Sequence, residues 1–386
     1  MRKFKEINPS PRTLMTPGPV EADPRVLRAM SAHILGQFDP EFTELMNETM
    51  EMERYVFQTK NRQTYLVDTT SRGGLETVLT GAICPGDKVL IPAFGRFGYL
   101  LAEILERCGA QITLLEKEWG TVFDPQEVED ALKKDSYKAV ACIHGETSTS
   151  MMQPLKEIGE ICRKHKVLFH TDAVQAAGHI PVNVKKQNID MLSLSAHKFH
   201  GPRGIGALYV KRGIELISLM EGGGQERGKR PGTENLPAIM GMAAALKEEC
   251  TLMEQNETRV TAMRDRLIQG LSQIPYSILN GSREKRLPGN VNFCFEGVSG
   301  ESLLLLLDSR GICASSGSAC ASGALDPSHV LLSLGLAPEI AQGSLRISLD
   351  ISNTEEEIDY MLEVIPQVVE QLRGMSDDWR KKHCED

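Results

Sequence analysis

Residues 190–202 read Asp190-Met191-Leu192-Ser193-Leu194-Ser195-Ala196-His197-Lys198-Phe199-His200-Gly201-Pro202. The first five residues are typical of a short β-strand, and the Gly-Pro pair at the end breaks regular structure. Lys198 therefore follows a strand on a short polar turn. Such a turn suits an amine that is held rigidly for Schiff-base chemistry.

Short β-rich runs alternate with amphipathic helical patterns from about residue 65 to residue 211. The β-rich runs span residues 88–92, 111–115, 139–143, 167–171, 190–194 and 206–210, and helical patterns span 97–108, 125–133 and 154–165. This alternation predicts an α/β fold with a mostly parallel, doubly wound sheet. Ligands of such sheets bind at the carboxyl ends of the strands.

A second, smaller α+β part is predicted after the glycine-rich loop 221–228. Helical patterns are expected at 237–253, 257–272, 301–309 and 354–373, and strands at 290–295 and 344–349. We predict a large cofactor-binding domain over residues 21–255, a small domain over 256–386 and an N-terminal segment, 1–20, that packs with the small domain. The charged end, 376–386, is expected to fray.

Composition restricts the classes of partner. The 386 residues hold 43 Lys and Arg against 52 Asp and Glu, a net charge of −9 without a basic block, so nucleic acid is not expected as a partner. No run approaches the roughly 20 apolar residues of a membrane helix, and the N-terminus does not resemble an export signal. Nine cysteines without Cys-x-x-Cys or metal-like spacing indicate reduced thiols in the cytoplasm, with neither a disulfide framework nor a metal site.

Asp172 follows the β-rich run 167–171. A carboxylate at a strand's carboxyl end can keep a pyridine nitrogen protonated, and the protonated ring is the electron sink of pyridoxal phosphate. A lone Asp more often caps a helix or forms a structural ion pair, and a lone Lys more often lies on the surface. Asp172 and Lys198 together favour a pyridoxal phosphate site.

A candidate phosphate site lies at Thr70-Ser71-Arg72-Gly73-Gly74, which precedes a helical pattern. Free backbone N–H groups and the helix dipole favour an anion at such a turn. An ordinary Ser or Thr helix cap has the same sequence, so the turn alone does not decide the matter.

Cys320 is the candidate nucleophilic thiol. Its neighbours in Ala314-Ser315-Ser316-Gly317-Ser318-Ala319-Cys320-Ala321-Ser322-Gly323 are too small to build an apolar packing site, which predicts a flexible loop. Attack on sulfur requires the thiolate, and a thiol with a pKa of roughly 8.5 is mostly protonated at neutral pH. Cys84, Cys108, Cys142, Cys162, Cys250 and Cys294 are expected to be buried small hydrophobes, and Cys313 to end a strand.

Four ordered motifs carry a family resemblance: residues 172–175, 195–198, 222–235 and the Cys320 loop. From about residue 167 to 373 the chain resembles the cysteine desulfurases, which belong to the class V aminotransferase group of fold-type I pyridoxal phosphate enzymes. The resemblance implies a large domain with a mostly parallel seven-stranded sheet and a smaller α+β C-terminal domain. It also implies a homodimer.

Residue roles follow from the same resemblance. It implies that Lys198 forms the Schiff base, that Asp172 pairs with the pyridine nitrogen and that Gln175 reaches the ring oxygen. Phosphate ligands would be Ser195 and His197, with Thr233 from the neighbouring subunit. For the substrate, Arg346 would bind the carboxylate, a role that suits its planar guanidinium.

Residues from about 10 to 165 resemble a different branch, the alanine- and ureidoglycine-glyoxylate aminotransferases. The matching segments are 16–20, which contains the substrate-site candidate Gly18, and 36–40, 95–99 and 144–149. Phe97 stands where desulfurases place a ring-stacking histidine, and a phenyl ring can stack but cannot transfer protons. Thr147 replaces the desulfurase asparagine near the ring oxygen.

The leading hypothesis is a cysteine desulfurase that forms a Cys320 persulfide from L-cysteine and passes the sulfur to an acceptor protein, as in iron–sulfur cluster assembly. The alternative is a class V aminotransferase that uses glyoxylate or a similar small oxo acid, which Phe97 and the N-terminal half favour. A third hypothesis is a noncatalytic pyridoxal-binding scaffold or sulfur-accepting partner.

Overall fold

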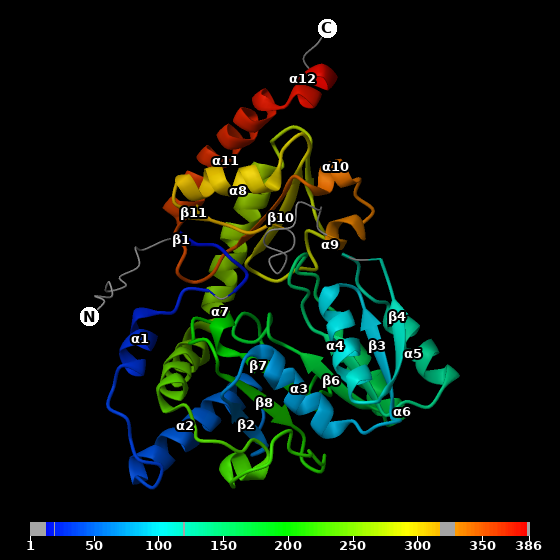
Figure 1. Cartoon of the computed structure of the whole chain (residues 1–386), viewed down its shortest axis with the longest axis vertical. Helices are drawn as coiled ribbons and strands as arrows, with labels where there is room; N and C mark the ends of the chain where they lie inside the picture. The colour runs from blue at the N-terminus through cyan, green and yellow to red at the C-terminus, as the bar shows by residue number, and fades with distance from the viewer. Residues whose placement is uncertain (1–12, 19, 119, 317–328, 384–386) are drawn as a thin grey trace, which may run out of the picture.

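The computed structural model describes residues 13–18, 20–118, 120–316 and 329–383 (Figure 1). A large sheet with its helices forms the lower part in Figure 1, and a smaller sheet with helices α8 (Gly300–Ser309) and α11 (Glu355–Met375) lies above it. Cys320 falls outside the described residues. Within the described residues, no helix combines the length and apolar character that crossing a bilayer requires.

The large sheet has seven strands in the order β2-β8-β7-β6-β5-β3-β4. Its strands are β2 (Thr64–Val67), β3 (Lys88–Ala93), β4 (Gln111–Glu116), β5 (Ala139–Ile143), β6 (Leu168–Asp172), β7 (Met191–Ser195) and β8 (Gly206–Val210). Strands β4, β3, β5, β6 and β7 run parallel, whereas β8 is antiparallel to both β7 and β2. The predicted α/β class and mostly parallel seven-stranded sheet are confirmed.

Helices cover this sheet because apolar residues recur along one side of each. They are α2 (Pro40–Val56), α3 (Ser71–Ala82), α4 (Arg96–Arg107), α5 (Pro125–Lys134) and α6 (Leu155–His165), whereas α1 (Pro24–Met30) packs against α7 (Leu236–Leu271). Helix α5 begins with a complete capping box, in which Asp124 and Glu127 each accept from the other's backbone N–H. The strands and the inner helix faces build one hydrophobic cluster, in which Val89, Leu90 and Ile91 have no exposed surface.

The smaller sheet has the order β12-β10-β9 and is antiparallel, with β9 (Ser277–Leu279), β10 (Asn290–Phe295) and β12 (Ser344–Ser348). Alternate residues of β10 and β12, such as Phe293 and Ile347, join a second hydrophobic cluster. Strand β1 (Thr13–Leu14) pairs with β11 (Ile312–Cys313), so Cys313 ends a strand as predicted. Short helices α9 (His329–Leu332) and α10 (Pro338–Ala341) precede β12.

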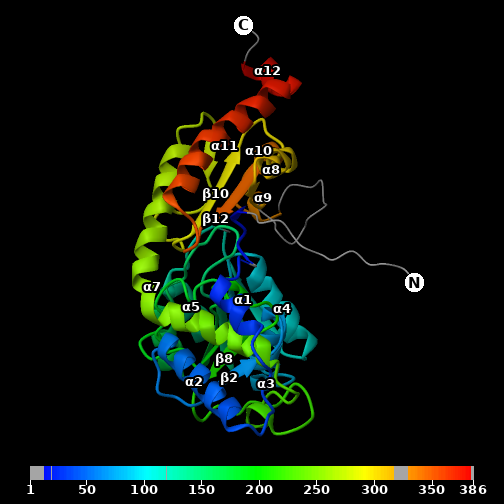
Figure 2. The ribbon, with the colours of Figure 1, turned by 90° about the vertical axis from the view of Figure 1, so that its left-hand side faces the viewer.

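Helix α7 (Leu236–Leu271) is continuous, which corrects the expectation of two helices at 237–253 and 257–272. Residues 254–256 are Glu, Gln and Asn, and nothing in that sequence breaks a helix. Figure 2 shows α7 running from beside the large sheet to beside the small one. Leu246 belongs to the first cluster and Val260 to the second. The predicted domain boundary at residue 255 lies inside this helix, and the domain division stays a prediction.

The C-terminal end is also more ordered than the sequence suggested. Residues Asp377–His383 form helix α12, so the expectation of a frayed end is wrong for these residues. The rings of Trp379 and His383 stack with centroids 3.9 Å apart, and the Arg373 guanidinium lies 4.3 Å from the Trp379 ring. The Trp379–His383 contact lies within α12, and the Arg373–Trp379 contact attaches α12 to α11.

Candidate active site

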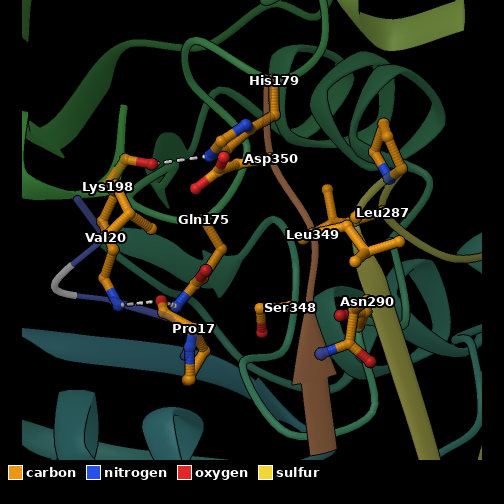
Figure 3. Close-up of a pocket in the computed structure, with 13 residues that line it drawn as sticks. Pro17, Val20, Gln175, His179, Lys198, Leu287, Asn290, Ser348, Leu349 and Asp350 are labelled. Atoms are coloured by element: carbon orange, nitrogen blue, oxygen red, sulfur yellow. Dashed lines mark hydrogen bonds between the residues drawn. The ribbon is translucent and has the colours of Figure 1, made fainter. Parts of the chain in front are cut away.

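Lys198 lies in a 3-10 turn, Ala196–Lys198, directly after β7, and its side chain is buried. Its Nζ donates to the carbonyl oxygen of Pro17 over 2.6 Å (Figure 3). Its own carbonyl oxygen accepts from Nε2 of His179 over 2.7 Å. Burial lowers the pKa of His179 to about 4, so this ring is neutral at pH 7. The lysine is therefore fixed at both its backbone and its amine.

Asp172 is the last residue of β6, the strand beside β7, as predicted. Its Oδ1 accepts from the N–H of Val174 over 2.9 Å. Burial raises the pKa of Asp172 to about 6, against the opposing effects of the Val174 hydrogen bond and the Lys198 charge. A further cation beside this carboxylate would stabilise its ionised form.

Gln175, Thr147 and Arg346 are brought together from three separate segments. Gln175 Nε2 donates to Thr147 Oγ1 over 3.1 Å, and Arg346 Nη1 donates to the Thr147 carbonyl oxygen over 3.2 Å. Arg346 is almost completely buried, with 1% of its surface exposed. Three of the predicted site residues thus share one hydrogen-bonded group.

The predicted phosphate residues lie at the same edge of the sheet. Val67, at the end of β2, and Ser195, at the end of β7, both pair with Gly206 between them. The turn that opens α3 follows β2, and Thr70 caps this helix by accepting from the Gly73 N–H over 3.3 Å. The N-terminus of α3 therefore lies at the same end of the sheet as the lysine turn that follows β7.

The other phosphate candidates differ in exposure. The Oγ of Ser195 shares a 2.8 Å hydrogen bond with Nδ1 of His197, and burial lowers the pKa of His197 to about 4. Ser71 and Arg72 lie in the first turn of α3, where Ser71 is half-buried and Arg72 is exposed. Both a neutral imidazole and a hydroxyl can donate to a phosphate oxygen.

The remaining predicted residues are not joined to this group by hydrogen bonds among the described residues. Phe97 lies in the first turn of α4, half-buried against the first hydrophobic cluster. Thr233 is exposed in the segment before α7. Burial of the other cysteines is confirmed for Cys142, Cys162 and Cys294, whereas Cys84 is exposed and Cys108 and Cys250 are half-buried.

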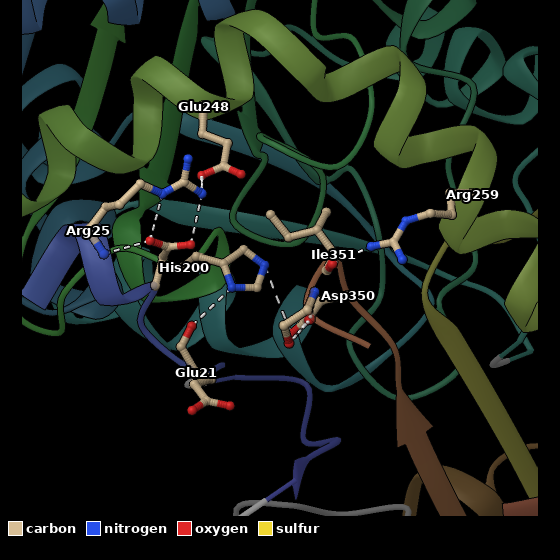
Figure 4. Close-up of polar contacts among 9 residues, drawn as sticks. Glu21, Arg25, His200, Glu248, Arg259, Asp350 and Ile351 are labelled. Atoms are coloured by element: carbon tan, nitrogen blue, oxygen red, sulfur yellow. Dashed lines mark hydrogen bonds and ion pairs between the residues drawn. The ribbon is translucent and has the colours of Figure 1, made fainter. Parts of the chain in front are cut away.

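A polar network around His200, two residues after Lys198 in the chain, was not anticipated from the sequence (Figure 4). Nδ1 of His200 donates to the Glu21 carbonyl oxygen over 3.0 Å, and its Nε2 lies 3.9 Å from Oδ2 of Asp350, just after β12. Arg25 bridges Asp23 and Glu248 of α7. His200 therefore links the lysine turn to the N-terminal segment, through Glu21, and to the end of the strand that carries Arg346, through Asp350.

Comparisons with known proteins identify the family of this chain. Residues 25–361 match the family described as Aminotransferase class-V. The chain belongs to the class-V aminotransferase family. This membership implies pyridoxal phosphate as the cofactor and confirms the resemblance predicted from the motifs.

Relatives of both expected kinds occur within the class-V family. "Cysteine desulfurase IscS" of Clostridium botulinum is 47% identical over 281 residues, which are 72% of this chain and 70% of the relative. The crystal structure of ureidoglycine-glyoxylate aminotransferase from Bacillus subtilis is 35% identical, with a TM-score of 0.78 over 97% of this chain and 96% of that one. Alanine–glyoxylate aminotransferase from Nostoc sp. has a TM-score of 0.81 at 26% identity, over 95% of this chain and 98% of that one.

The described residues of this member of the class-V family fit pyridoxal phosphate. The aldehyde of this cofactor requires an amine, and its ring nitrogen requires a carboxylate that keeps it protonated. Its phosphate requires several hydrogen-bond donors. Lys198, Asp172 and the N-terminus of α3 offer these three groups at one edge of the sheet. A Cβ on Gly18 would fill the space that the Lys198 side chain uses, so the N-terminal segment is shaped around this amine.

Proposed function

We propose that the protein is a pyridoxal-phosphate-dependent cysteine desulfurase, which removes sulfur from L-cysteine, releases L-alanine and keeps the sulfur as a persulfide on Cys320. The observation that carries this proposal is the 47% identity to a relative named cysteine desulfurase over 281 residues. The order of the motifs around Asp172, Lys198 and Cys320 supports it further.

The cofactor would be held by residues from several separate segments around the large sheet. Lys198 would bind its aldehyde carbon, Asp172 its ring nitrogen, and Gln175 with Thr147 its ring oxygen. Phe97 would stack on the ring. The phosphate would be bound by Ser195, His197, Thr70, Ser71 and Arg72, with Thr233 from a second copy of the chain. When bound, the cofactor supplies an electron sink for the substrate's α-carbon.

The chain's own residues then position and cleave the substrate. Arg346 would bind the carboxylate of L-cysteine beside Gly18, and the amine of Lys198 would remove the proton from the α-carbon. The Cys320 thiolate would attack the substrate sulfur, so that a sulfur–sulfur bond forms as the carbon–sulfur bond breaks. The electron pair of the broken bond stays with carbon, which takes up a proton to become the methyl group of L-alanine.

A single-turnover experiment tests this function. The holoenzyme is mixed with one equivalent of L-cysteine, and L-alanine and the Cys320 persulfide are quantified together. Both should form in equal amounts, and Cys320→Ser should form neither. Cys313→Ser, in β11 of the same segment, is the matched control and should retain both. Sulfide release by Cys320→Ser at the parental rate would contradict the proposal.

A second candidate function is glyoxylate aminotransfer, which the structural match to the Bacillus subtilis enzyme favours. L-Alanine with glyoxylate would then give pyruvate and glycine. L-Alanine alone would bleach the absorbance band of the lysine-bound cofactor. If that band persists in saturating L-alanine, this candidate is rejected.

We also propose a homodimer that passes sulfur to an acceptor protein. The apolar side chains of Ile34 and Phe38, between α1 and α2, are 74% and 91% exposed. A second copy of the chain would bury them. The resemblance to desulfurases extends the proposal to a cytoplasmic location and to sulfur supply for iron–sulfur clusters. Sedimentation of the protein and of Phe38→Asp tests the dimer, since the charged variant should sediment as a monomer.

A further inference from the structure

A second cleft lies at the end of the large sheet opposite Lys198. Leu168 at the start of β6, Asp190 just before β7 and Lys211 just after β8 all line it. Strands β6 and β7 run parallel and carry Asp172 and the lysine turn at their other ends, so the cleft is separate from the site described above. Its volume is about 520 Å³, which is typical of clefts that hold small organic ligands.

Basic side chains from three segments surround this cleft. They come from the end of α6, from the loop before β7 and from the turn after β8, so no basic block marks them in the sequence. The five exposed cations that line the cleft are Arg163, Lys166, Lys185, Lys211 and Arg212. Among the described residues that line it, Asp190 is the one acid. The cleft is therefore strongly positive in a chain whose net charge is −9.

Most of this positive charge is not neutralised by the fold. Lys211 pairs with Asp190 over 2.7 Å, and Arg163 donates to Oδ1 of Asn188 over 3.3 Å. The cations whose side chains have no partner in the described ranges of the chain are Lys166, Lys185 and Arg212. Like charges that gather without counter-ions repel one another, so a bound anion lowers the free energy of this cleft.

The floor of the cleft is apolar. Val167, Val184 and Ile189 line it and are buried members of the first hydrophobic cluster, and Ile214 packs against that cluster. A hydrated inorganic ion would leave this floor in contact with water. A ligand that fills the cleft therefore needs an uncharged part for the floor as well as negative charges for the rim.

We infer that this cleft binds a small organic polyphosphate, such as a nucleoside triphosphate. Each phosphate group carries about −1.5 to −2 charges, so a short chain of phosphates supplies the charge that several cations require within a small volume. The planar guanidinium of Arg212 suits a bidentate contact with phosphate, and Lys166 and Lys185 supply further positive charges. The uncharged part of the ligand lies on the apolar floor.

The size of the cleft favours a small ligand over a macromolecule. A protein partner of ordinary affinity buries about 800 Å² on each side, which requires a broad surface rather than a hollow of this volume. The net charge of −9 opposes a nucleic acid. The inference goes beyond the proposed function, because no residue lines both this cleft and the Lys198 pocket.

Calorimetric titration of the holoenzyme with ATP, in buffer without divalent cations, tests the inference. The bound cofactor keeps its own phosphate site occupied, so the titration measures a separate site. ATP should bind with one equivalent per chain, and its Kd should rise with salt because the contacts are ionic. Adenosine, which has no phosphate, should not bind. Tripolyphosphate, which has no uncharged part, should bind more weakly than ATP.

Reversing two of the unpaired cations assigns the binding to this cleft. Lys185→Glu combined with Arg212→Glu should weaken ATP binding by about tenfold or more. The absorbance of the lysine-bound cofactor should stay equal to that of the parent protein, which shows that the variant folds. Arg283→Glu combined with Lys381→Glu is the matched control, since it reverses two exposed cations outside the cleft and should leave ATP binding unchanged.

The inference is overturned if ATP does not bind, if adenosine binds as well as ATP, or if the two double variants bind ATP equally. A hexaglutamate peptide provides the last comparison. Tighter binding of this peptide than of ATP would assign the cleft to an acidic protein segment and would also overturn the inference. None of these titrations contains L-cysteine, so their results are independent of whether Cys320 forms a persulfide.

Discussion

The side chain of Lys198 packs directly against Gly18: a Cβ built on Gly18 would lie 2.5 Å from Cδ and 2.6 Å from Nζ of the lysine. Gly18 also has φ +112°, where other residues are strained. We predict that Gly18→Ala displaces the Lys198 amine and lowers the fraction of protein with covalently bound cofactor. The absorbance band of the lysine–cofactor Schiff base measures that fraction.

Gly374→Ala, near the end of α11, is the control for this substitution. The space around a Cβ at Gly374 is open to 4 Å, and its backbone is outside the left-handed region. Its Schiff-base absorbance should equal that of the parent protein. If Gly18→Ala also keeps the full band, the N-terminal segment does not set the position of Lys198.

Asp172→Asn tests the carboxylate at the end of β6. An amide has the same shape but no charge with which to keep a ring nitrogen protonated, so L-alanine formation should fall on the order of a hundredfold. Asp190→Asn is a buried control at the other end of the sheet, where Asp190 accepts from the Phe169 N–H and pairs with Lys211. Its activity per bound cofactor should be retained, and equal losses in both variants would contradict a specific role for Asp172.

The sequence located the parallel strands well because buried parallel strands read as continuous apolar runs. The predicted runs at 88–92 and 139–143 correspond to β3 and β5 within a residue. Strand β2, only four residues long at the sheet edge, was not among them. Helix α7 was divided in two because its apolar face changes from one core to the other near residue 255.

The positions of candidate residues were predictable where they follow a recognisable strand, as for Asp172 at the end of β6 and Lys198 directly after β7. The Pro17 carbonyl that holds the lysine amine is a backbone atom and leaves no side-chain signal. Asn290 and Ser348, which line the Lys198 pocket, meet only through the register of two strands more than 50 residues apart. The only indication in the sequence was the alternation of polar and apolar residues in 290–295. Alternation predicts a strand with one polar face, but it does not show which residues or ligand that face contacts.

Arg346→Lys tests recognition of the substrate carboxylate. Lysine keeps the charge but loses the planar pair of donors, so KM for L-cysteine should rise by about tenfold or more, with a smaller effect on kcat. Arg310→Lys is the control, since Arg310 is exposed and bonds Gln367 on α11. A reduced kcat with unchanged KM in Arg346→Lys would instead assign Arg346 to positioning the Thr147 loop.

Glu249 of α7 makes stability depend on pH. Its side chain is 2% exposed, and its Oε2 has no hydrogen-bond partner among the described residues. Burial, reinforced by the charges of Glu248 and Asp350, raises the pKa of Glu249 to about 8 from its usual 4.5. Between these two pH values the unfolded chain releases a proton that the folded chain retains, so stability falls as pH rises through this window.

Glu249→Gln removes this titration while keeping the size of the side chain. The variant should therefore gain in thermal midpoint over the parent holoenzyme as pH rises from 5 to 8, with a difference on the order of a few kcal/mol in unfolding free energy at pH 8. Glu254→Gln, exposed on the same helix, should show no such pH-dependent gain. Parallel stability curves for Glu249→Gln and the parent from pH 5 to pH 8 would mean that the buried carboxyl ionises freely in the folded protein.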